Sequence, residues 1–210
     1  MTFSLSQGAS KLAKLGVVVK RLSAIEDLGS IEILCTDKTG TITQNKLGIT
    51  EVNSYQVDQT LIHAGYCSVT VDATRDPFDL AIQSKLNDNN MQLGEYQLID
   101  QLPFDPVRKR NSVLIKTPFV QTLVSRGAPE AILESTTLSK EDKRGILDWV
   151  EIQGRNGRRV LAIASKTHTA SSFSDFDERG MSYLGAISFE DPLKDSTKEA
   201  IEKAMSLGVQ

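Results

Sequence analysis

Residues 31–43 constrain the fold of this chain more than any other stretch, because an apolar run ends there abruptly at an acid. The run at 31–35 is rich in β-forming residues, and small polar residues and Gly40 follow it at once. This pattern predicts a buried strand that ends at Asp37. In open α/β sheets ligands bind beyond the carboxyl ends of the strands, so we expect Asp37 to face a crevice.

A carboxylate at a strand end can hold a cation or attack an electrophile, since aspartate is already ionised at neutral pH and needs no general base. The next residues suit phosphoryl transfer: Lys38 carries positive charge, Thr39 a hydroxyl, and Gly40 lets backbone N–H groups turn toward phosphate oxygens. The sequence therefore predicts an aspartyl phosphate at Asp37, with Lys38 and Thr39 as further catalytic residues. Mg²⁺, a hard ion that prefers oxygen ligands, is expected on Asp37 and the Thr39 carbonyl.

The composition excludes several classes of protein. With 40% hydrophobic and 24% charged residues among 210, the chain is an ordinary globular protein. Its net charge of −3 gives no reason to expect nucleic acid as a partner. No apolar stretch approaches the ~18 residues of a membrane span, so we expect a soluble, monomeric fragment. Cys35 and Cys67 lie far apart, which argues against a disulfide framework or a zinc site.

Hydrophobic periodicity and turn residues predict helices and strands along the whole chain. Asp76 and Pro77 suit the start of a helix, and Ser139 is a good cap for a longer one. Helices are expected at 4–15, 23–28, 76–86, 129–133, 139–154 and near 200–208; strands at 47–52, 96–102, 112–116, 119–124, 158–165 and 183–189; and an exposed polar loop at 167–180.

The clustering of these strands indicates how the chain is divided. Most of them fall between 96 and 189 with helices between, which favours a mainly antiparallel sheet with helices beside it. The two ends of the chain look instead like parts of a parallel α/β unit. The expected fold is therefore α/β (α+β): an antiparallel-sheet domain at 47–190, inserted between residues 1–46 and 191–210 of a partial parallel domain.

Several separated motifs resemble P-type cation-transporting ATPases, and within them the proton- and magnesium-pump branches. The string Cys-Thr-Asp-Lys-Thr-Gly-Thr-Ile-Thr-Gln-Asn-Lys around Asp37 is similar to the family's phosphorylation signature. Four further segments resemble the family's adenine-stacking segment, nucleotide-pocket motif, arginine-bearing strand and interdomain hinge; they begin at Phe104, Ser125, Gly157 and Asp191.

The resemblance implies a nucleotide-binding domain inserted into a haloacid-dehalogenase-like phosphorylation domain, at the cytoplasmic face of a membrane. It implies ATP and Mg²⁺ as ligands, and the transmembrane, actuator and remaining phosphorylation domains of the same pump as partners. It assigns six residues to ATP: Phe104 stacked on adenine, Asp79 near the adenine edge, Lys109, Arg126 and Gly127 in the pocket, and Arg159 at the phosphates.

The sequence departs from that family at some positions. Arg126 stands where the family has lysine, and Leu193 and Lys194 stand where its hinge often has proline and arginine. The chain also lacks the family's Thr-Gly-Glu actuator loop and the Thr-Gly-Asp-Gly segment that completes the magnesium site. We therefore expect an excised cytoplasmic piece of a pump.

Two other functions stay open from the residues alone. A soluble phosphatase or phosphotransferase with the same Asp37 chemistry would need a second acid two residues later, where Thr39 stands. A plain nucleotide-binding module would bind its ligand without catalysing a reaction. The sequence has no Walker loop, so in each case ATP would bind in a stacking pocket.

Overall fold

The computed structural model describes residues 2–68 and 76–210, apart from the side chains of Thr2 and Thr39. The chain forms two compact units: unit 1 comprises Met1–Gln44 and Leu193–Gln210, and unit 2 comprises Asn45–Pro192. In the described part of the chain, no helix has the length and apolar character needed to cross a lipid bilayer.

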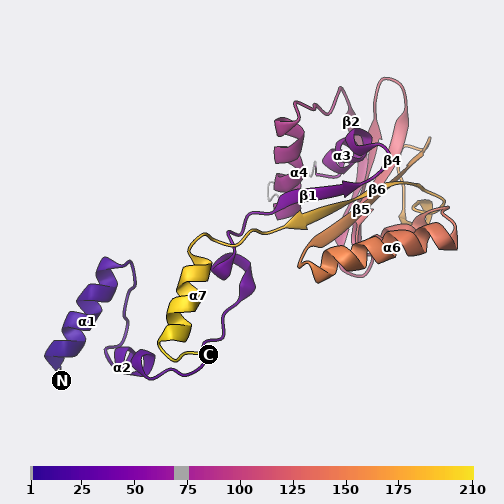
Figure 1. Ribbon diagram of the computed structural model, residues 1–210. Helices are drawn as coiled ribbons and strands as arrows, with labels where there is room; N and C mark the ends of the chain where they lie inside the picture. Colours follow the sequence, from indigo (N-terminus) through magenta and orange to yellow (C-terminus); the bar gives the residue numbers. More distant parts are fainter. Residues whose placement is uncertain (1, 69–75) are drawn as a thin grey trace. The chain divides into compact units, whose positions relative to one another are not determined.

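Unit 2 is built on one antiparallel sheet (Figure 1). Its six strands lie in the order β1-β6-β5-β4-β3-β2, and every neighbouring pair is antiparallel. The strands are β1 (Gly48–Asn53), β2 (Gln97–Asp105), β3 (Arg110–Lys116), β4 (Gln121–Gly127), β5 (Arg159–Thr167) and β6 (Ser182–Glu190). The antiparallel sheet predicted from the sequence is confirmed.

Helices cover both faces of this sheet, and each face has its own apolar core. Helices α3 (Val57–Tyr66) and α4 (Pro77–Asp88) pack on one face, where Ile82 is fully buried. Helices α5 (Pro129–Ser135) and α6 (Lys140–Arg155) pack on the other. Consecutive side chains of a strand point to opposite faces, so the two cores take alternate residues of strands β3 to β6.

Two helix starts follow the rules for capping. The Asp76 carboxylate accepts a hydrogen bond from the Phe78 N–H at 2.9 Å, and Pro77 occupies the first position of α4. Ser139 Oγ accepts a hydrogen bond from the Asp142 N–H at 3.1 Å at the start of α6. Both predicted helix starts are confirmed.

Unit 1 lacks the strand predicted to end at Asp37. Its elements are α1 (Thr2–Lys14), α2 (Ser23–Gly29), a π-helical turn (Lys38–Ile42) and α7 (Thr197–Ser206). Residues 31–37 carry no regular secondary structure and are exposed, Ile33 to 70%. The prediction is wrong because a parallel strand is stable when both of its faces are covered. Among the described residues of unit 1, no hydrophobic side chain is fully buried.

Two backbone hydrogen bonds nevertheless join this stretch to residue 210. The Leu34 N–H donates to the Gln210 carbonyl at 2.9 Å, and the Gln210 N–H donates to the Glu32 carbonyl at 2.8 Å. Gln210 lies opposite Ile33 and bonds to the residues on either side of it, which is the hydrogen-bond pattern of two parallel strands. The described residues form no parallel sheet, but the direction of this pairing is parallel.

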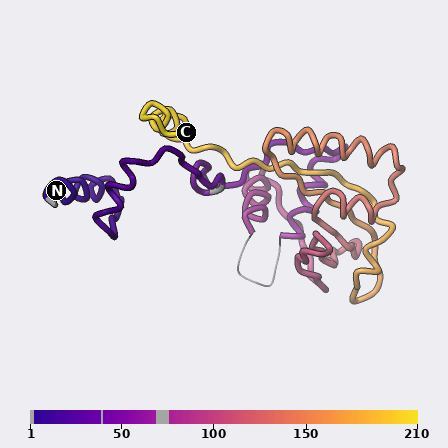
Figure 2. Tube along the Cα trace, turned by 90° about the horizontal axis from the view of Figure 1, so that it is seen from below, coloured from indigo at the N-terminus to yellow at the C-terminus, as the bar shows by residue number. Residues whose placement is uncertain are grey.

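The chain passes between the units twice, and the two linking segments run side by side (Figure 2). Asp191 Oδ1 accepts a hydrogen bond from the Lys46 N–H at 3.1 Å, and Gly48 of β1 pairs with Glu190 of β6. Asn45 adopts a left-handed conformation, with φ 54°, just before β1. Unit 2 therefore begins and ends at one pair of neighbouring strands.

Candidate functional site

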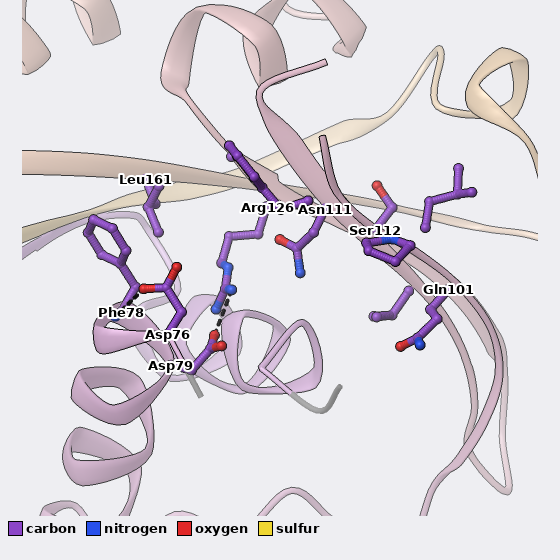
Figure 3. A pocket seen from close by; sticks show the side chains of 13 residues that line it. Asp76, Phe78, Asp79, Gln101, Asn111, Ser112, Arg126 and Leu161 are labelled. Carbon is purple, nitrogen blue, oxygen red and sulfur yellow. Dashed lines mark hydrogen bonds and ion pairs between the residues drawn. The ribbon is translucent and has the colours of Figure 1, made fainter. Parts of the chain in front are cut away.

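A pocket of about 390 Å³ lies beside α4 and strands β2, β3 and β4 of unit 2 (Figure 3). That volume falls within the ~300–1,000 Å³ of typical small-molecule sites. Its apolar walls are Phe78, Leu102, Pro103, Phe104, Val113 and Leu161; its polar groups are Asp76, Asp79, Gln101, Asn111, Ser112 and Arg126, with Gly127 beside them. Four of the six residues that the resemblance assigns to ATP therefore lie in one pocket.

A buried ion pair between α4 and β4 closes the inner end of the pocket. Arg126 Nη2 lies 2.6 Å from Asp79 Oδ1, and the two side chains are 8% and 5% exposed. Figure 3 shows them pointing toward each other. Arg126 Nη1 also donates to Ser68 Oγ at 2.8 Å. The Arg126 charge is thus matched within the protein by the Asp79 carboxylate.

Cys67 lies near this ion pair and is inert. Burial raises the pKa of the Cys67 thiol to about 12, and the nearby Arg126 offsets this only in part. Asn111 Nδ2 donates to the Cys67 carbonyl at 2.9 Å, which ties β3 to the end of α3. The Cys67 thiol is therefore neutral at neutral pH.

One wall of the pocket is formed by the end of β2 and the start of β3, which a short turn joins. Phe104 is 64% exposed, although it lines the pocket. Lys109 adopts φ 53°, and its N–H donates to the Asp105 carbonyl at 2.7 Å. Backbone hydrogen bonds from Arg108 and Val107 lower the pKa of the Asp105 carboxyl, which keeps it charged within the turn. Among the described residues the exposed Lys109 ammonium has no partner.

Gly127 is required for this turn to pack on β4. A Cβ atom at Gly127 would lie 2.3 Å from the Lys109 carbonyl oxygen and 2.4 Å from the Arg110 Cβ. The Ala128 N–H donates to the same Lys109 carbonyl at 2.9 Å. The glycine therefore lets two backbones approach closely at the pocket wall.

We expect Gly127→Ala to lower the free energy of unfolding by about 1–3 kcal/mol, because the added methyl displaces the Lys109 turn. Urea denaturation of the whole chain measures it. Gly145→Ala is the matched control, since a Cβ at this exposed helical position meets nothing within 4 Å. The control should leave stability unchanged or raise it by up to about 1 kcal/mol. Equal stability of the two variants would contradict the close approach.

Arg159 is not among the residues that line the pocket. It is the exposed first residue of β5, two positions before Leu161, which does line the pocket. Residues two apart in a strand share a face, so Arg159 lies on the pocket side of β5. In the described part of the chain the Arg159 guanidinium has no hydrogen-bond or ion-pair partner.

The three predicted catalytic residues all belong to unit 1. Asp37 is exposed and extended, with φ −71° and ψ 147°, directly before the π-helical turn that contains Lys38 and Thr39. Thr43 Oγ1 closes this turn: it accepts from the Gly40 N–H at 3.0 Å and donates to the Lys38 carbonyl at 3.2 Å. The Thr39 side chain lies outside the described residues. The acid thus stands at the entry to a defined loop.

Sequence reasoning missed the role of Lys194. Its Nζ donates to the Gly40 and Thr41 carbonyls, each at 2.9 Å, so it fastens the loop that follows Asp37. It also missed the pocket residues Gln101, Asn111 and Ser112. The alternation of apolar and polar residues in β2 and β3 could have indicated which of these share a face, but it carries no sign of a ligand.

Sequence comparison relates this chain to a known family of proteins. Residues 26–196 match the family model described as "P-type ATPase, cytoplasmic domain N". The magnesium-transporting ATPase, P-type 1, of Salmonella typhimurium is 32% identical over 227 residues, which cover all of this chain and 25% of that protein. A putative cation-transporting ATPase of Methanocaldococcus jannaschii is 31% identical, with the same two coverages. Plasma membrane ATPase 2 of Schizosaccharomyces pombe is 31% identical over all of this chain and 21% of its own length.

The chain spans about a quarter of the length of the curated relatives that it matches. The family model covers all of unit 2 and parts of the two segments that flank it. Together with the antiparallel sheet and its pocket, this match shows that the chain belongs to the P-type ATPase family and contains its cytoplasmic N domain.

Proposed function

We propose that unit 2 binds ATP in the pocket between α4 and the β2–β4 strands, as part of an ATP-driven cation pump. The observation that carries this proposal is an exposed aromatic ring, Phe104, on the rim of a pocket whose inner end is a buried acid–base pair. A flat base can stack on Phe104 while its polar edge meets Asp79 and Asn111.

The cations around the pocket would have two different roles, one at the base and one at the phosphates. Arg126 is held by Asp79 and Ser68, so its task is to fix the Asp79 carboxylate where the adenine edge enters. Lys109 and Arg159 are exposed and suit the phosphate tail, which needs point charges and fork-shaped donors. A single stacked base with a few exposed cations yields roughly 4–6 kcal/mol, or a dissociation constant of ~0.1–1 mM.

We further propose that Asp37 accepts the γ-phosphoryl group in the longer protein, within a haloacid-dehalogenase-like phosphorylation domain to which unit 1 contributes. A carboxylate oxygen of Asp37 forms a bond to Pγ as the bond from Pγ to the bridging oxygen breaks, and ADP leaves with that electron pair. Lys38 offers charge to the transferred group, and Lys194 holds the loop.

The residues present fit a magnesium ion that arrives with the nucleotide. Asp37 supplies one carboxylate, and no group of three or more acids, histidines or cysteines gathers in the described residues. Mg²⁺ is commonly held by one or two carboxylates together with substrate phosphates. Asp37 and the Thr39 carbonyl would hold it, and it would neutralise charge on the phosphates. The transmembrane, actuator and remaining phosphorylation domains of the same pump are the proposed partners, at the cytoplasmic side of a membrane.

The test of the pocket is Phe104→Ala, which should weaken ATP binding by about tenfold, since stacking contributes on the order of 1 kcal/mol. Phe104→Trp should bind as well as the wild type. Calorimetric titration or nuclear magnetic resonance shifts measure the affinity. The matched control is Phe119→Ala, because Phe119 is 95% exposed and is not among the pocket residues. Unchanged affinity in Phe104→Ala would rule out this pocket as the adenine site.

A further inference from the structure

A fully buried carboxylate, that of Glu178, contacts the β2–β3 hairpin, whose strands form one wall of the pocket. Glu178 has no exposed surface, although it sits in the polar segment predicted to be an exposed loop, directly after a short 3₁₀ turn (Asp175–Asp177). The prediction is wrong at this residue. A buried charge is tolerated when it is paired and hydrogen-bonded, so the partners of Glu178 indicate what it does.

All three partners of Glu178 come from the β2–β3 turn and β3. Arg108 Nη1 lies 2.8 Å from Oε1, and Arg110 Nε lies 2.5 Å from Oε2. Ser112 Oγ donates to Oε1 at 2.5 Å. Both carboxylate oxygens are therefore engaged, and two cations meet one anion.

These partners lead directly to the pocket. Arg108 also donates from Nη2 to the Pro103 carbonyl at 2.9 Å, and Pro103 precedes Phe104 in the pocket wall. Ser112 lines the pocket itself. One carboxylate thus holds the two strands of the hairpin at the points where they border the ligand space.

We propose that Glu178 is a positioning residue for the nucleotide, acting through the β2–β3 hairpin. It fixes Arg108 and Arg110 away from the ligand, so that Lys109 is the member of the Arg-Lys-Arg run left for the phosphates. It also sets the backbone that carries Phe104. This inference rests on the proposed ATP site and adds a residue that touches no ligand.

A role in stability alone would give a different result. If Glu178 only supported the fold, its replacement would lower the free energy of unfolding, and its effect on ATP affinity would not depend on whether Phe104 is present. If it positions Phe104, the two residues must be coupled in ATP binding. A double-mutant cycle separates these possibilities, because residues that act independently give additive effects.

The experiment measures ATP affinity of the whole chain for wild type, Glu178→Gln, Phe104→Ala and the double variant. Glu178→Gln should weaken ATP by about threefold to tenfold. In the Phe104→Ala background the same change should alter affinity by less than about twofold. Glu190→Gln is the control: its partner Arg158 lies 3.0 Å away in a partly exposed pair, and neither residue lines the pocket.

Each outcome decides one point. Unchanged affinity in Glu178→Gln, or the same loss in both backgrounds, would overturn the positioning role. Unchanged affinity in Phe104→Ala alone would instead overturn the proposed ATP site. If Glu178→Gln fails to fold, Arg108→Met takes its place, because it breaks the link to Pro103 while Arg110 and Ser112 still satisfy the carboxylate. It should weaken ATP by about threefold, and normal binding would overturn the proposal.

Discussion

Asp79→Asn should lower the free energy of unfolding of this chain by about 3–5 kcal/mol. The change leaves the Arg126 guanidinium, whose side chain is 8% exposed, without its counter-charge at the inner end of the pocket. An unpaired buried charge costs far more than the pair contributes when intact. Urea denaturation measures the loss, followed by the fluorescence of Trp149 in α6, the single tryptophan of the chain.

The double variant Asp79→Leu with Arg126→Met should recover most of that loss. It removes both charges together, and apolar residues of similar volume often replace a buried ion pair at little cost. Ser68 Oγ would keep a partner, because it also donates to the Ala64 carbonyl at 3.1 Å. The double variant should fold but bind ATP poorly, because it lacks the acid that we propose meets the adenine edge.

The matched control for Asp79→Asn is Glu190→Gln. It breaks the pair with Arg158, in which the side chains are 28% and 42% exposed, so it should cost at most about 1 kcal/mol. If Asp79→Asn costs no more than this control, the inner end of the pocket is open to water and the ion pair does not hold it together.

Helices and strands with local signals could be predicted from the sequence. The Asp76 cap with Pro77 at the first position defines the start of α4 without reference to the rest of the chain. Helix α3 was missed, although Val57, Leu61 and Ala64 recur at helical spacing, because Gln56 makes no side-chain cap to announce it. The helical spacing of its apolar residues was the only sequence feature that indicated this helix.

The parts that depend on distant residues could not be predicted in this way. The strand expected before Asp37 needs neighbours on both sides, and the described residues offer it one parallel partner, Gln210. Asp79 and Arg126 are 47 positions apart, and no local pattern pairs them. Glu178 stands in a polar run whose composition is that of a loop, so its burial follows from tertiary packing alone. The candidate residues of the pocket came from the family resemblance.

In the longer pump of which we propose this chain is a part, Asp37→Asn should abolish the phosphoenzyme formed with ATP and Mg²⁺. An amide is not a nucleophile, so no acyl phosphate can form. ATP binding should persist, because the proposed adenine site lies in unit 2 and Asp37 in unit 1. The measurement is radiolabelled phosphate retained after acid quenching and released by hydroxylamine.

The control for that experiment is Asp27→Asn, which makes the same chemical change at another exposed aspartate of unit 1, in α2. It should label as strongly as the wild type, so that loss in Asp37→Asn reports the nucleophile and not a general effect of removing charge. The 210-residue chain should bind ATP without turning it over, since the described residues of unit 1 bury no apolar core and bring no group of three or more metal-ligating side chains together. Steady phosphate release from the chain, removed by Asp37→Asn, would show that these residues suffice for catalysis and would favour a free-standing phosphotransferase. Undiminished labelling in the longer Asp37→Asn protein would place the phosphorylated residue elsewhere, because the loop fastened by Lys194 would then hold no acceptor.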